Sequence, residues 1–273
     1  MSSPVMTPRL SDTELRAIAK LVYEKSGIVL HDGKRELITS RLQKRLRHLG
    51  VATYAEYLRL AERDPAELVT LLDSIATNHT HFFREARHFE ILTSRVLQTT
   101  AARRGGELRG WCAACSTGEE PYTILMSLLE AGCGSVRLLA SDMSTKALAT
   151  AKSGVYRLDK MEDVPKALLP KYFEKGLGAQ AGLARVQPSL RRLVEFRALN
   201  LLEVSSLGQQ FDFIFCRNVM IYFDKAVQQR VVSMLERHLA PGGYLFIAHS
   251  ESLNGITHDL ATIAPAAFQR RAA

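Results

Sequence analysis

Two polar loops in this chain directly follow apolar, strand-like runs. One loop, Arg217-Asn218-Val219-Met220-Ile221-Tyr222, follows the run Phe211-Asp212-Phe213-Ile214-Phe215-Cys216. The other, Cys115-Ser116-Thr117-Gly118-Glu119-Glu120-Pro121, follows an earlier apolar run. Open parallel sheets bind ligands beyond the carboxyl ends of their strands. The two loops therefore predict a ligand crevice in a fold of alternating strands and helices.

Strand-like and helical segments alternate through the second part of the chain. Expected strands cover residues 108–114, 136–141, 193–197, 211–216 and 244–248. Expected helices cover residues 85–97, 121–131, 145–152 and 225–239, and Pro241-Gly242-Gly243 should form a turn before the last strand. Strands separated by helices favour a doubly wound, mostly parallel sheet of the α/β class.

The chain divides into two expected domains. Residues 1–75 have apolar residues at helical spacing and predict a small all-helical domain, which begins at the capping box Ser11-Asp12-Thr13-Glu14. Residues 76–273 would form the α/β domain, with the polar and aromatic segment 74–84 as a linker that closes over it. The alternation breaks at about 156–190, which predicts a small inserted subdomain with a glycine-containing turn at 176–182.

The helix expected over residues 34–49 carries two stripes. Its apolar stripe consists of Ile38, Leu42, Leu46 and Leu49, and its basic stripe of Arg41, Lys44, Arg45 and His48, with Arg47 adding further charge. A basic stripe of this kind is either a solvated helix face or a surface that binds an acidic partner. The formal net charge of +8 favours acidic partners in general, which include nucleic acid, anionic lipid and acidic protein surfaces.

Composition indicates a cytoplasmic protein. The chain has no apolar run near the ~18 residues that span a bilayer, and its opening residues lack the apolar core of a signal peptide. It has four cysteines, too few for a disulfide framework in 273 residues. Cys112 and Cys115 have the spacing of a redox or zinc half-site, but we favour buried core cysteines, and the spacings predict no metal site.

The first loop lacks the glycine pattern of dinucleotide-binding folds, because only Gly118 is present. Pro121 suits the first position of a helix, and Ser116 and Thr117 could cap that helix or hydrogen-bond near its amino end. Asp142 ends the next strand, roughly where doubly wound folds place an acid that binds ribose hydroxyls. The alternative is that Asp142 caps the helix that starts near residue 145.

Four motifs follow one another along the chain: Asn78-x-Thr80-x-Phe82-Phe83-Arg84, Cys115-Ser116-Thr117-Gly118-Glu119-Glu120-Pro121-Tyr122, Asn200-Leu201-Leu202 and Cys216-Arg217-Asn218-Val219-Met220-Ile221-Tyr222-Phe223. In this order they resemble the motifs of the CheR family of chemotaxis chemoreceptor methyltransferases. The resemblance covers nearly the whole chain. It implies a class I methyltransferase-like sheet and transfer of a methyl group from S-adenosylmethionine to receptor glutamates, with S-adenosylhomocysteine as the product.

The resemblance also implies roles for individual residues. Asn78, Thr80 and Arg84 would approach the cofactor from the linker, and Glu119 would contact its methionine end. Asp142 would hold the ribose, and Asn200 and Leu201 would border the adenine. Arg217 and Asn218 would line the floor near the reacting methyl group, with Tyr222 close by. Arg84 would position the incoming carboxylate, and Tyr222 would hydrogen-bond near the transfer path. A salt bridge at a helix start is the alternative for Arg84.

The implied partner is an acidic helical bundle of a chemoreceptor. The basic residues Arg41, Lys44, Arg45 and Arg47 would bind it, and the inserted subdomain could add a peptide from the receptor's carboxyl terminus as an extra strand. Two rival functions are a nucleic-acid methyltransferase and a non-enzymatic sensor. The loop Arg217-Asn218-Val219-Met220 lacks the Pro-Pro-aromatic run typical of adenine methyltransferases, and the basic helix lacks interleaved stacking residues, so no nucleic-acid partner is expected.

Overall fold

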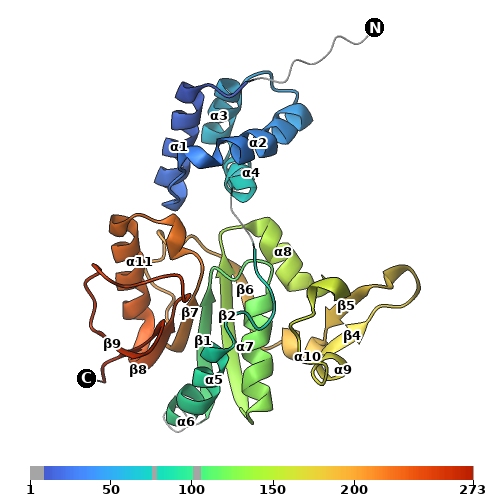
Figure 1. The fold of residues 1–273 in the computed structure, drawn as a ribbon, viewed down its shortest axis with the longest axis vertical. Coiled ribbons are helices and arrows are strands. Elements are labelled where there is room, and N and C mark those ends of the chain that lie inside the picture. Colours follow the sequence, from blue (N-terminus) through green and yellow to red (C-terminus); the bar gives the residue numbers. More distant parts are fainter. Residues whose placement is uncertain (1–8, 76–78, 101–105, 273) are drawn as a thin grey trace. The chain divides into compact units, whose positions relative to one another are not determined.

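The computed structural model describes residues 9–75, 79–100 and 106–272 (Figure 1). The chain forms two compact units. The first unit comprises Met1–Thr77 and the short segment Tyr222–Asp224. The second unit comprises Asn78–Ile221 and Lys225–Ala273.

The first unit is built from helices, as the apolar spacing predicts. Ser11 and Glu14 form the expected capping box, and Ile38, Leu42 and Leu46 lie in the core with at most 1% of their surface exposed. The helices of this unit are α1 (Asp12–Ser26), η1 (Asp32–Lys34), α2 (Arg35–Leu49), α3 (Tyr54–Arg63) and α4 (Pro65–Ile75).

The segment Tyr222–Asp224 belongs to the first unit because it contacts the end of α1 and the residues after it. The Val29 amide donates to the Tyr222 carbonyl at 2.8 Å, and the Tyr23 hydroxyl donates to Asp224 at 2.7 Å. Phe223 also forms an isolated antiparallel bridge with Ile28. A turn from the second half of the sequence is thereby held by α1.

The second unit contains a seven-stranded sheet in the order β6-β2-β1-β7-β8-β10-β9. In this order, each pair of neighbouring strands from β6 through β2, β1 and β7 to β8 is parallel, whereas β10 is antiparallel to β8 and to β9. The first strand lies inside the sheet with β2 and β6 on one side and β7 and β8 on the other, so the expected doubly wound topology is present. The strands are β1 (Glu107–Ala113), β2 (Ser135–Asp142), β6 (Val194–Ala198), β7 (Phe211–Cys216), β8 (Leu239–Phe246), β9 (Leu260–Ala264) and β10 (Ala267–Arg270).

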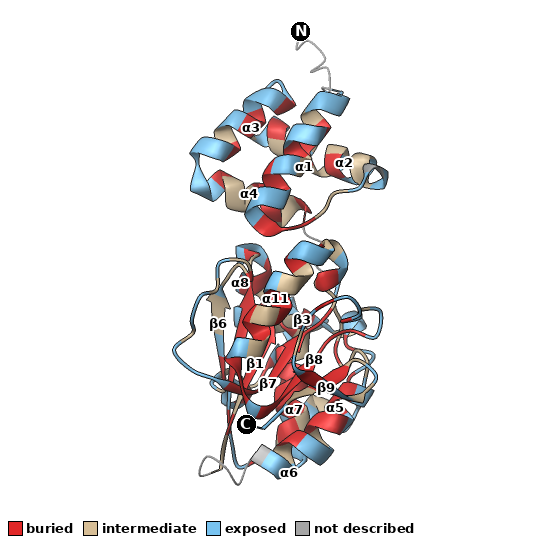
Figure 2. Ribbon diagram, turned by 90° about the vertical axis from the view of Figure 1, so that its left-hand side faces the viewer, coloured by how far each residue is buried: buried red, intermediate tan, exposed pale blue. Residues whose placement is uncertain are grey.

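Helices cover the sheet from both sides (Figure 1). Side chains of α5 and α7 share a core with Cys112 and Phe213, whereas Trp111, the preceding residue of β1, makes an edge-to-face contact with His238 at the end of α11. Figure 2 shows the strands as a largely buried layer. The helices are α5 (Arg87–Ile91), a π-helical turn η2 (Leu92–Val96), α6 (Leu97–Thr100), α7 (Glu119–Glu130), α8 (Thr145–Ser153), η5 (Met220–Tyr222) and α11 (Lys225–His238).

The inserted subdomain is a three-stranded antiparallel sheet in the order β3-β5-β4. Its hairpin loop holds the expected glycine-containing turn, between Lys175 and Leu183, and Leu177 there is 82% exposed. Its elements are β3 (Val155–Arg157), η3 (Leu158–Lys160), α9 (Leu169–Tyr172), β4 (Phe173–Lys175), η4 (Gly178–Gln180), β5 (Leu183–Val186) and α10 (Pro188–Arg191).

Two local expectations are wrong. Pro241, Gly242 and Gly243 lie inside β8 and not before it. Phe211 of β7 is paired with Leu239, and Phe213 is paired with Tyr244, so β8 has more residues than β7 between these two pairs. The extra residues are taken up as a register shift, with Gly242 at φ 73°. Pro121 is not the first residue of its helix, because α7 already begins at Glu119.

Candidate active site

The polar loops meet at one edge of the sheet because its strands are in parallel register. Ala113, at the end of β1, is paired with Ser141 on one side and with Cys216 on the other. Asp142 is likewise paired with Ala198, the last residue of β6. The carboxyl ends of β6, β2, β1 and β7 thus lie side by side at the point where the topology reverses, which is where such sheets bind ligands.

Asp142 is buried at the end of β2, where its carboxylate organises the loop after β1. One oxygen accepts the Ser116 amide at 2.8 Å and the other accepts the Ser144 amide at 2.8 Å. The N-cap of α8 is Ser144, whose hydroxyl accepts from the Ala147 amide, so the alternative prediction that Asp142 caps this helix is wrong.

The loop after β1 is tightly folded. Ala114 and Ser116 both have left-handed backbone conformations, with φ of 65° and 49°, and Gly118 has φ 97°. A Cβ atom on Gly118 would lie 2.7 Å from the Ala151 Cβ and 2.8 Å from the Tyr156 hydroxyl. Gly118 is also the N-cap of α7 and no side chain caps that helix, so capping by Ser116 or Thr117 is wrong, whereas the alternative that they hydrogen-bond near its amino end holds for Thr117, which donates to Glu119.

Two polar groups of this loop point to a ligand. The Ser116 hydroxyl oxygen is buried and has no hydrogen-bond partner among the described residues. The Glu119 carboxylate accepts a hydrogen bond of 2.6 Å from the Thr117 hydroxyl, and burial raises its pKa above the ordinary value. A buried carboxyl group with a raised pKa favours a cationic partner, which would restore its ionised form.

Residues after β6 join the same edge. The Leu199 amide donates to the Asp142 carbonyl at 3.0 Å, which places the following residues beside the end of β2. Asn200 shapes the turn, because its side-chain oxygen accepts the Leu202 amide at 3.1 Å. Leu201 is only 9% exposed and offers an apolar surface there.

Arg217 follows β7, and both terminal nitrogens of its guanidinium have partners within the protein, whereas its buried Nε atom has none among the described residues. Its side chain, 1% exposed, forms ion pairs with Glu85 at 3.0 Å and Glu120 at 2.7 Å. It also donates to the Arg84 carbonyl at 2.6 Å. Burial alone would raise the pKa of Glu85, but the Arg217 guanidinium lowers it below its ordinary value. Arg217 thus joins β7 and α7 to the segment that carries Arg84.

Glu251 holds the loop after β7 and was not expected from the sequence. Its carboxylate accepts the amides of Asn218 at 3.2 Å and Met220 at 2.9 Å, and also that of Ala248 at 2.7 Å. Asn218 has a left-handed conformation with φ 59°, which the carboxylate helps to maintain. The sequence signal was only a lone acid shortly after an apolar strand.

The segment before α5 belongs to the second unit and packs against its inserted subdomain. Phe82 is buried and its ring lies 5.0 Å from that of Tyr156 and 5.6 Å from that of Phe173. The half-buried Arg84 donates to the His79 carbonyl at 3.1 Å, and no acidic side chain among the described residues forms an ion pair with it. Thr80 is half-buried, whereas Asn78 lies outside the described residues.

Tyr222 is placed in the first unit. Its carbonyl accepts from Val29, and the Lys34 ammonium lies 4.8 Å from the centre of its ring. The structure therefore brings together Glu119, Asp142, Asn200, Leu201, Arg217 and Asn218 at the sheet edge, while it groups Tyr222 with α1.

The basic stripe of α2 is split between two environments. Arg41 donates to the carbonyls of Ser74 and Ile75, and Arg45 forms a bidentate ion pair with the buried Glu67 of α4. Lys44 and Arg47 are exposed. Arg41 and Arg45 thus join α2 to α4, and Lys44 and Arg47 are the members of the predicted receptor-binding set that are exposed.

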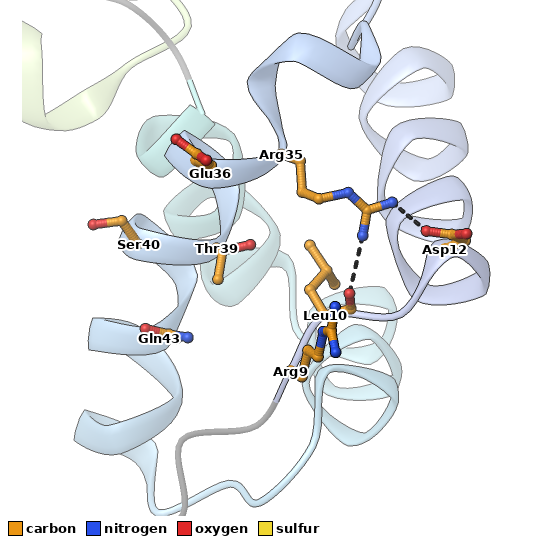
Figure 3. Close-up of a pocket in the computed structure, with 8 residues that line it drawn as sticks. All are labelled: Arg9, Leu10, Asp12, Arg35, Glu36, Thr39, Ser40 and Gln43. Carbon is orange, nitrogen blue, oxygen red and sulfur yellow. Dashed lines mark hydrogen bonds and ion pairs between the residues drawn. The ribbon is translucent and has the colours of Figure 1, made fainter.

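A separate surface pocket of about 720 Å³ lies in the first unit (Figure 3). Arg35 is held at its rim by the Leu10 carbonyl and by an ion pair with Asp12. Arg9 and Glu36 also line it, so positive and negative groups are balanced and the pocket favours neither sign of ligand charge.

Comparisons with known proteins identify the family. Residues 78–267 match the CheR methyltransferase SAM binding domain, and residues 13–76 match the CheR methyltransferase all-alpha domain. The chemotaxis protein methyltransferases of Salmonella typhimurium and Escherichia coli are each 43% identical to this chain, over 93% and 91% of it and over 89% and 88% of their own lengths. Chemotaxis protein methyltransferase 2 of Pseudomonas aeruginosa is 42% identical, over 90% of this chain and 88% of its own.

The chain belongs to the CheR methyltransferase family. It is a methyltransferase that uses S-adenosylmethionine (SAM), and the described residues fit this cofactor. The unpartnered Ser116 hydroxyl beside Asp142 suits a ligand with hydroxyl groups, and the buried Glu119 suits one with an ammonium group. None of the helices in the described ranges combines the length and apolar character needed to cross a bilayer.

The cysteine prediction is also resolved in this CheR family member. Cys112 and Cys115 are free thiols in the core, at 0% and 1% exposure. Burial raises the pKa of both thiols well above the ordinary value, which disfavours the thiolate needed for redox chemistry or metal binding. Plain core cysteines are confirmed.

Proposed function

We propose that this protein transfers the methyl group of SAM to glutamate side chains of chemoreceptors and forms methyl esters. The observation that carries the proposal is the family match over both units, together with the polar residues gathered at the carboxyl edge of the sheet. The relatives from Salmonella typhimurium and Escherichia coli, each 43% identical to this chain, are chemotaxis protein methyltransferases. A chemoreceptor substrate of this kind presents its helices in the cytoplasm, where this protein would act.

We assign the cofactor-binding roles to residues of the second unit. Asp142, with the Ser116 hydroxyl, would hold the ribose, and Glu119 would pair with the ammonium of the methionine end. Asn200 and Leu201 would border the adenine. Asn78 and Thr80 would approach from the segment before α5, and Asn218 would line the floor beneath the methyl group. When bound, SAM supplies an electrophilic methyl group on a positively charged sulfur.

The acceptor needs little help from the protein to become a nucleophile. A glutamate side chain has a pKa of about 4.3 and is already ionised near neutral pH, so no general base is required. Attack of the carboxylate on the methyl group neutralises both charges. Alignment and exclusion of water are therefore the main contributions expected from the site.

Arg84 is our candidate for aligning the acceptor carboxylate. Its backbone is fixed by Arg217, which donates to the Arg84 carbonyl, while its guanidinium is half-buried. The buried Arg217 is already paired with Glu85 and Glu120, so we assign it a positioning role beneath Arg84. Tyr222 would hydrogen-bond near the transfer path, as the family resemblance implies.

The receptor surface is proposed to include the exposed residues of α2. Lys44 and Arg47 carry charge at the surface, whereas Arg41 and Arg45 contribute by holding α2 in place. A receptor carboxyl-terminal peptide would add as a strand to the inserted sheet, in which β3 and β4 are the outer strands.

The test is a transfer assay with tritiated SAM and purified chemoreceptor, DNA and RNA as separate acceptors. We expect label on the receptor alone, released as methanol in alkali because methyl esters hydrolyse in base. Label on nucleic acid would identify a nucleic-acid methyltransferase, and SAM binding without transfer to any receptor would support a sensor.

Variants of Arg84 test its assigned role. Arg84→Ala should keep SAM affinity but lose most receptor methylation, whereas Arg87→Ala, which removes an exposed neighbouring arginine, should retain it. Full methylation by Arg84→Ala would refute the assignment to Arg84 and leave the proposed reaction intact.

A further inference from the structure

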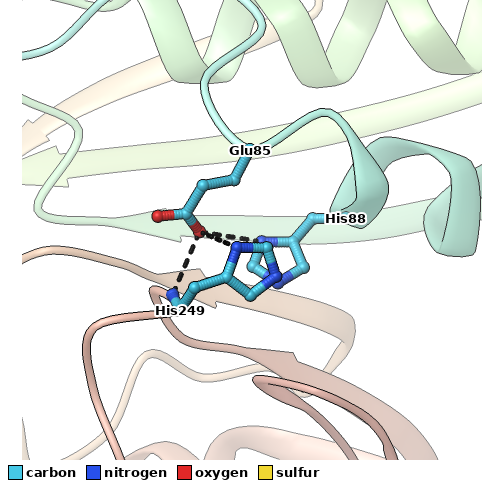
Figure 4. A group of neighbouring side chains, drawn as sticks. All are labelled: Glu85, His88 and His249. Atoms are coloured by element: carbon cyan, nitrogen blue, oxygen red, sulfur yellow. Dashed lines mark hydrogen bonds and ion pairs between the residues drawn. The ribbon is translucent and has the colours of Figure 1, made fainter.

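Three side chains of the second unit form a cluster that the methyl-transfer chemistry does not use (Figure 4). Glu85 lies just before α5, His88 lies in its first turn, and His249 comes from the residues after β8. The Glu85 Oε2 atom lies 3.5 Å from the Nδ1 atom of His88 and 3.5 Å from the Nδ1 atom of His249. One ligand atom from each residue lies within 4.8 Å of the others.

The spacing of these atoms suits a small divalent transition metal. Bonds of about 2.1 Å from Zn²⁺ to nitrogen and oxygen, at tetrahedral angles, place neighbouring ligand atoms roughly 3.4 Å apart. Two imidazoles and one carboxylate are also a ligand set that zinc sites use. The two distances from Glu85 are already 3.5 Å, whereas the histidine ligand atoms lie within 4.8 Å of each other, and any separation beyond the metal-site spacing would have to close when a metal binds.

The environment of His88 favours metal binding by its imidazole. It is 0% exposed, and neither ring nitrogen makes a hydrogen bond of good geometry to the described residues, although the backbone of Pro265 also interacts with the ring. Burial, with Arg217 and His249, lowers the pKa of His88 to about 4, so its imidazole is neutral near pH 7. A neutral imidazole has the lone pair that binds a metal.

His249 provides access to the cluster. Its side chain is 41% exposed, and its backbone amide donates to the Glu85 Oε2 atom at 3.2 Å. An ion could thus reach the buried His88 from the His249 side, with a position left for water, as in metal sites with three protein ligands.

Arg217 is the competing cation at this carboxylate. Its guanidinium lies 3.0 Å from the same Glu85 oxygen, and it remains paired with Glu120 at 2.7 Å. A bound metal would share or replace Arg217 at Glu85. The alternative to a metal site is a buried ion pair with two neutral histidines beside it.

We infer that Glu85, His88 and His249 form a binding site for one divalent transition metal of the Zn²⁺ type. The site touches the candidate active site through Arg217, which pairs with Glu85, but its metal binding can be measured without the proposed reaction. Metal binding would connect the start of α5 to the residues after β8.

The test uses the full chain without a polyhistidine tag, titrated with Co²⁺ and Zn²⁺ salts alone. We expect one equivalent of Co²⁺ to give visible absorption bands of a low-symmetry site, which Zn²⁺ then abolishes by displacement. His249→Ala should weaken binding at least tenfold. The control His258→Ala removes another histidine of the same unit and should bind as the wild type does.

His88→Phe provides a second variant that retains an aromatic ring in the core, and thermal melting reports whether each variant is folded. If the folded wild type binds no stoichiometric Co²⁺ or Zn²⁺, the cluster is only an ion-pair network and the inference is wrong. Equal binding by His249→Ala and the wild type would also overturn it.

Discussion

Asp142 and Arg217 lie at the same edge of the sheet but differ in what their polar atoms contact. Asp142 accepts two backbone amides of the neighbouring loops and thereby sets their shape. Arg217 joins two carboxylates and the Arg84 carbonyl. Removing either residue would leave buried polar groups without partners, so a loss of activity on mutation would not by itself prove contact with SAM.

Glu119 should make cofactor binding depend on pH. Burial raises its pKa above the ordinary value, while Thr117 and the nearby charge of His81 act in the opposite direction. As pH falls through this raised pKa, the carboxylate becomes protonated and loses its attraction for the cofactor's ammonium group. SAM affinity should therefore decrease in mildly acidic buffer, as measured by calorimetry from about pH 8 to about pH 5.

Glu119→Gln isolates this effect. It should weaken SAM binding by about 1.5–3 kcal/mol near neutral pH, the usual contribution of a hydrogen bond to a charged group, and should flatten the pH profile. Glu162→Gln removes an exposed carboxyl of the same unit and should change neither quantity. An unchanged slope in Glu119→Gln would assign the pH dependence to another group.

At the scale of elements, the turn between β1 and α7 leaves no room for a Cβ atom at Gly118. Gly118→Ala would place a methyl group within 2.9 Å of Ala151 and Tyr156 at a left-handed φ. Gly132→Ala has a similar φ of 83° but open space around the new methyl group. Both should lose about 1 kcal/mol of folding free energy to backbone strain, but only Gly118→Ala should also lose SAM affinity.

Calorimetry of SAM binding and urea unfolding of both variants separate strain from displacement of the loop. Equal SAM affinity in Gly118→Ala and Gly132→Ala would show that the loop after β1 accommodates the methyl group without any loss of SAM affinity. It would also remove the support that Ser116 and Glu119 give to the cofactor assignment.

The junction of α2 and α4 makes a second prediction at this scale. Arg45→Met would leave the carboxylate of Glu67, which is 4% exposed, without its bidentate partner. Breaking a buried pair from one side costs about 3–5 kcal/mol, so urea unfolding should shift markedly. Lys44→Met changes the exposed neighbouring position and should keep the free energy of unfolding within about 0.5 kcal/mol of that of the wild type. A loss as large as that of Arg45→Met would contradict the conclusion that Arg45, and not Lys44, joins α2 to α4.

The sequence predicted helices and strands better than it predicted the contact partners of individual side chains. Runs such as Phe211–Cys216 are buried on both faces, so their apolar character alone located β7 and the loop after it. The partners of Arg45, Asn218 and Arg217 are Glu67, Glu251 and Glu85, which become neighbours only through the packing of distant elements. Helical periodicity places Arg45 on a polar face of α2, but it does not reveal that α4 supplies a buried acid.

For the whole molecule, the positive charge should influence how fast an acidic receptor is found. The chain carries a formal net charge of +8, and long-range attraction of this kind raises association rates and weakens as salt screens it. Receptor methylation at low receptor concentration should therefore slow as ionic strength rises. SAM binding occurs within a small site and should change much less.

The double substitution Lys44→Glu and Arg47→Glu distinguishes a local surface from net charge. If α2 contacts the receptor, kcat/KM for receptor methylation should fall by roughly tenfold at low salt, with a flatter salt dependence and unchanged SAM affinity and melting temperature. The control Arg16→Glu and Lys20→Glu alters the same amount of charge at exposed positions of α1. An equal decrease in the control would mean that overall charge steers the encounter and that α2 is not the contact surface.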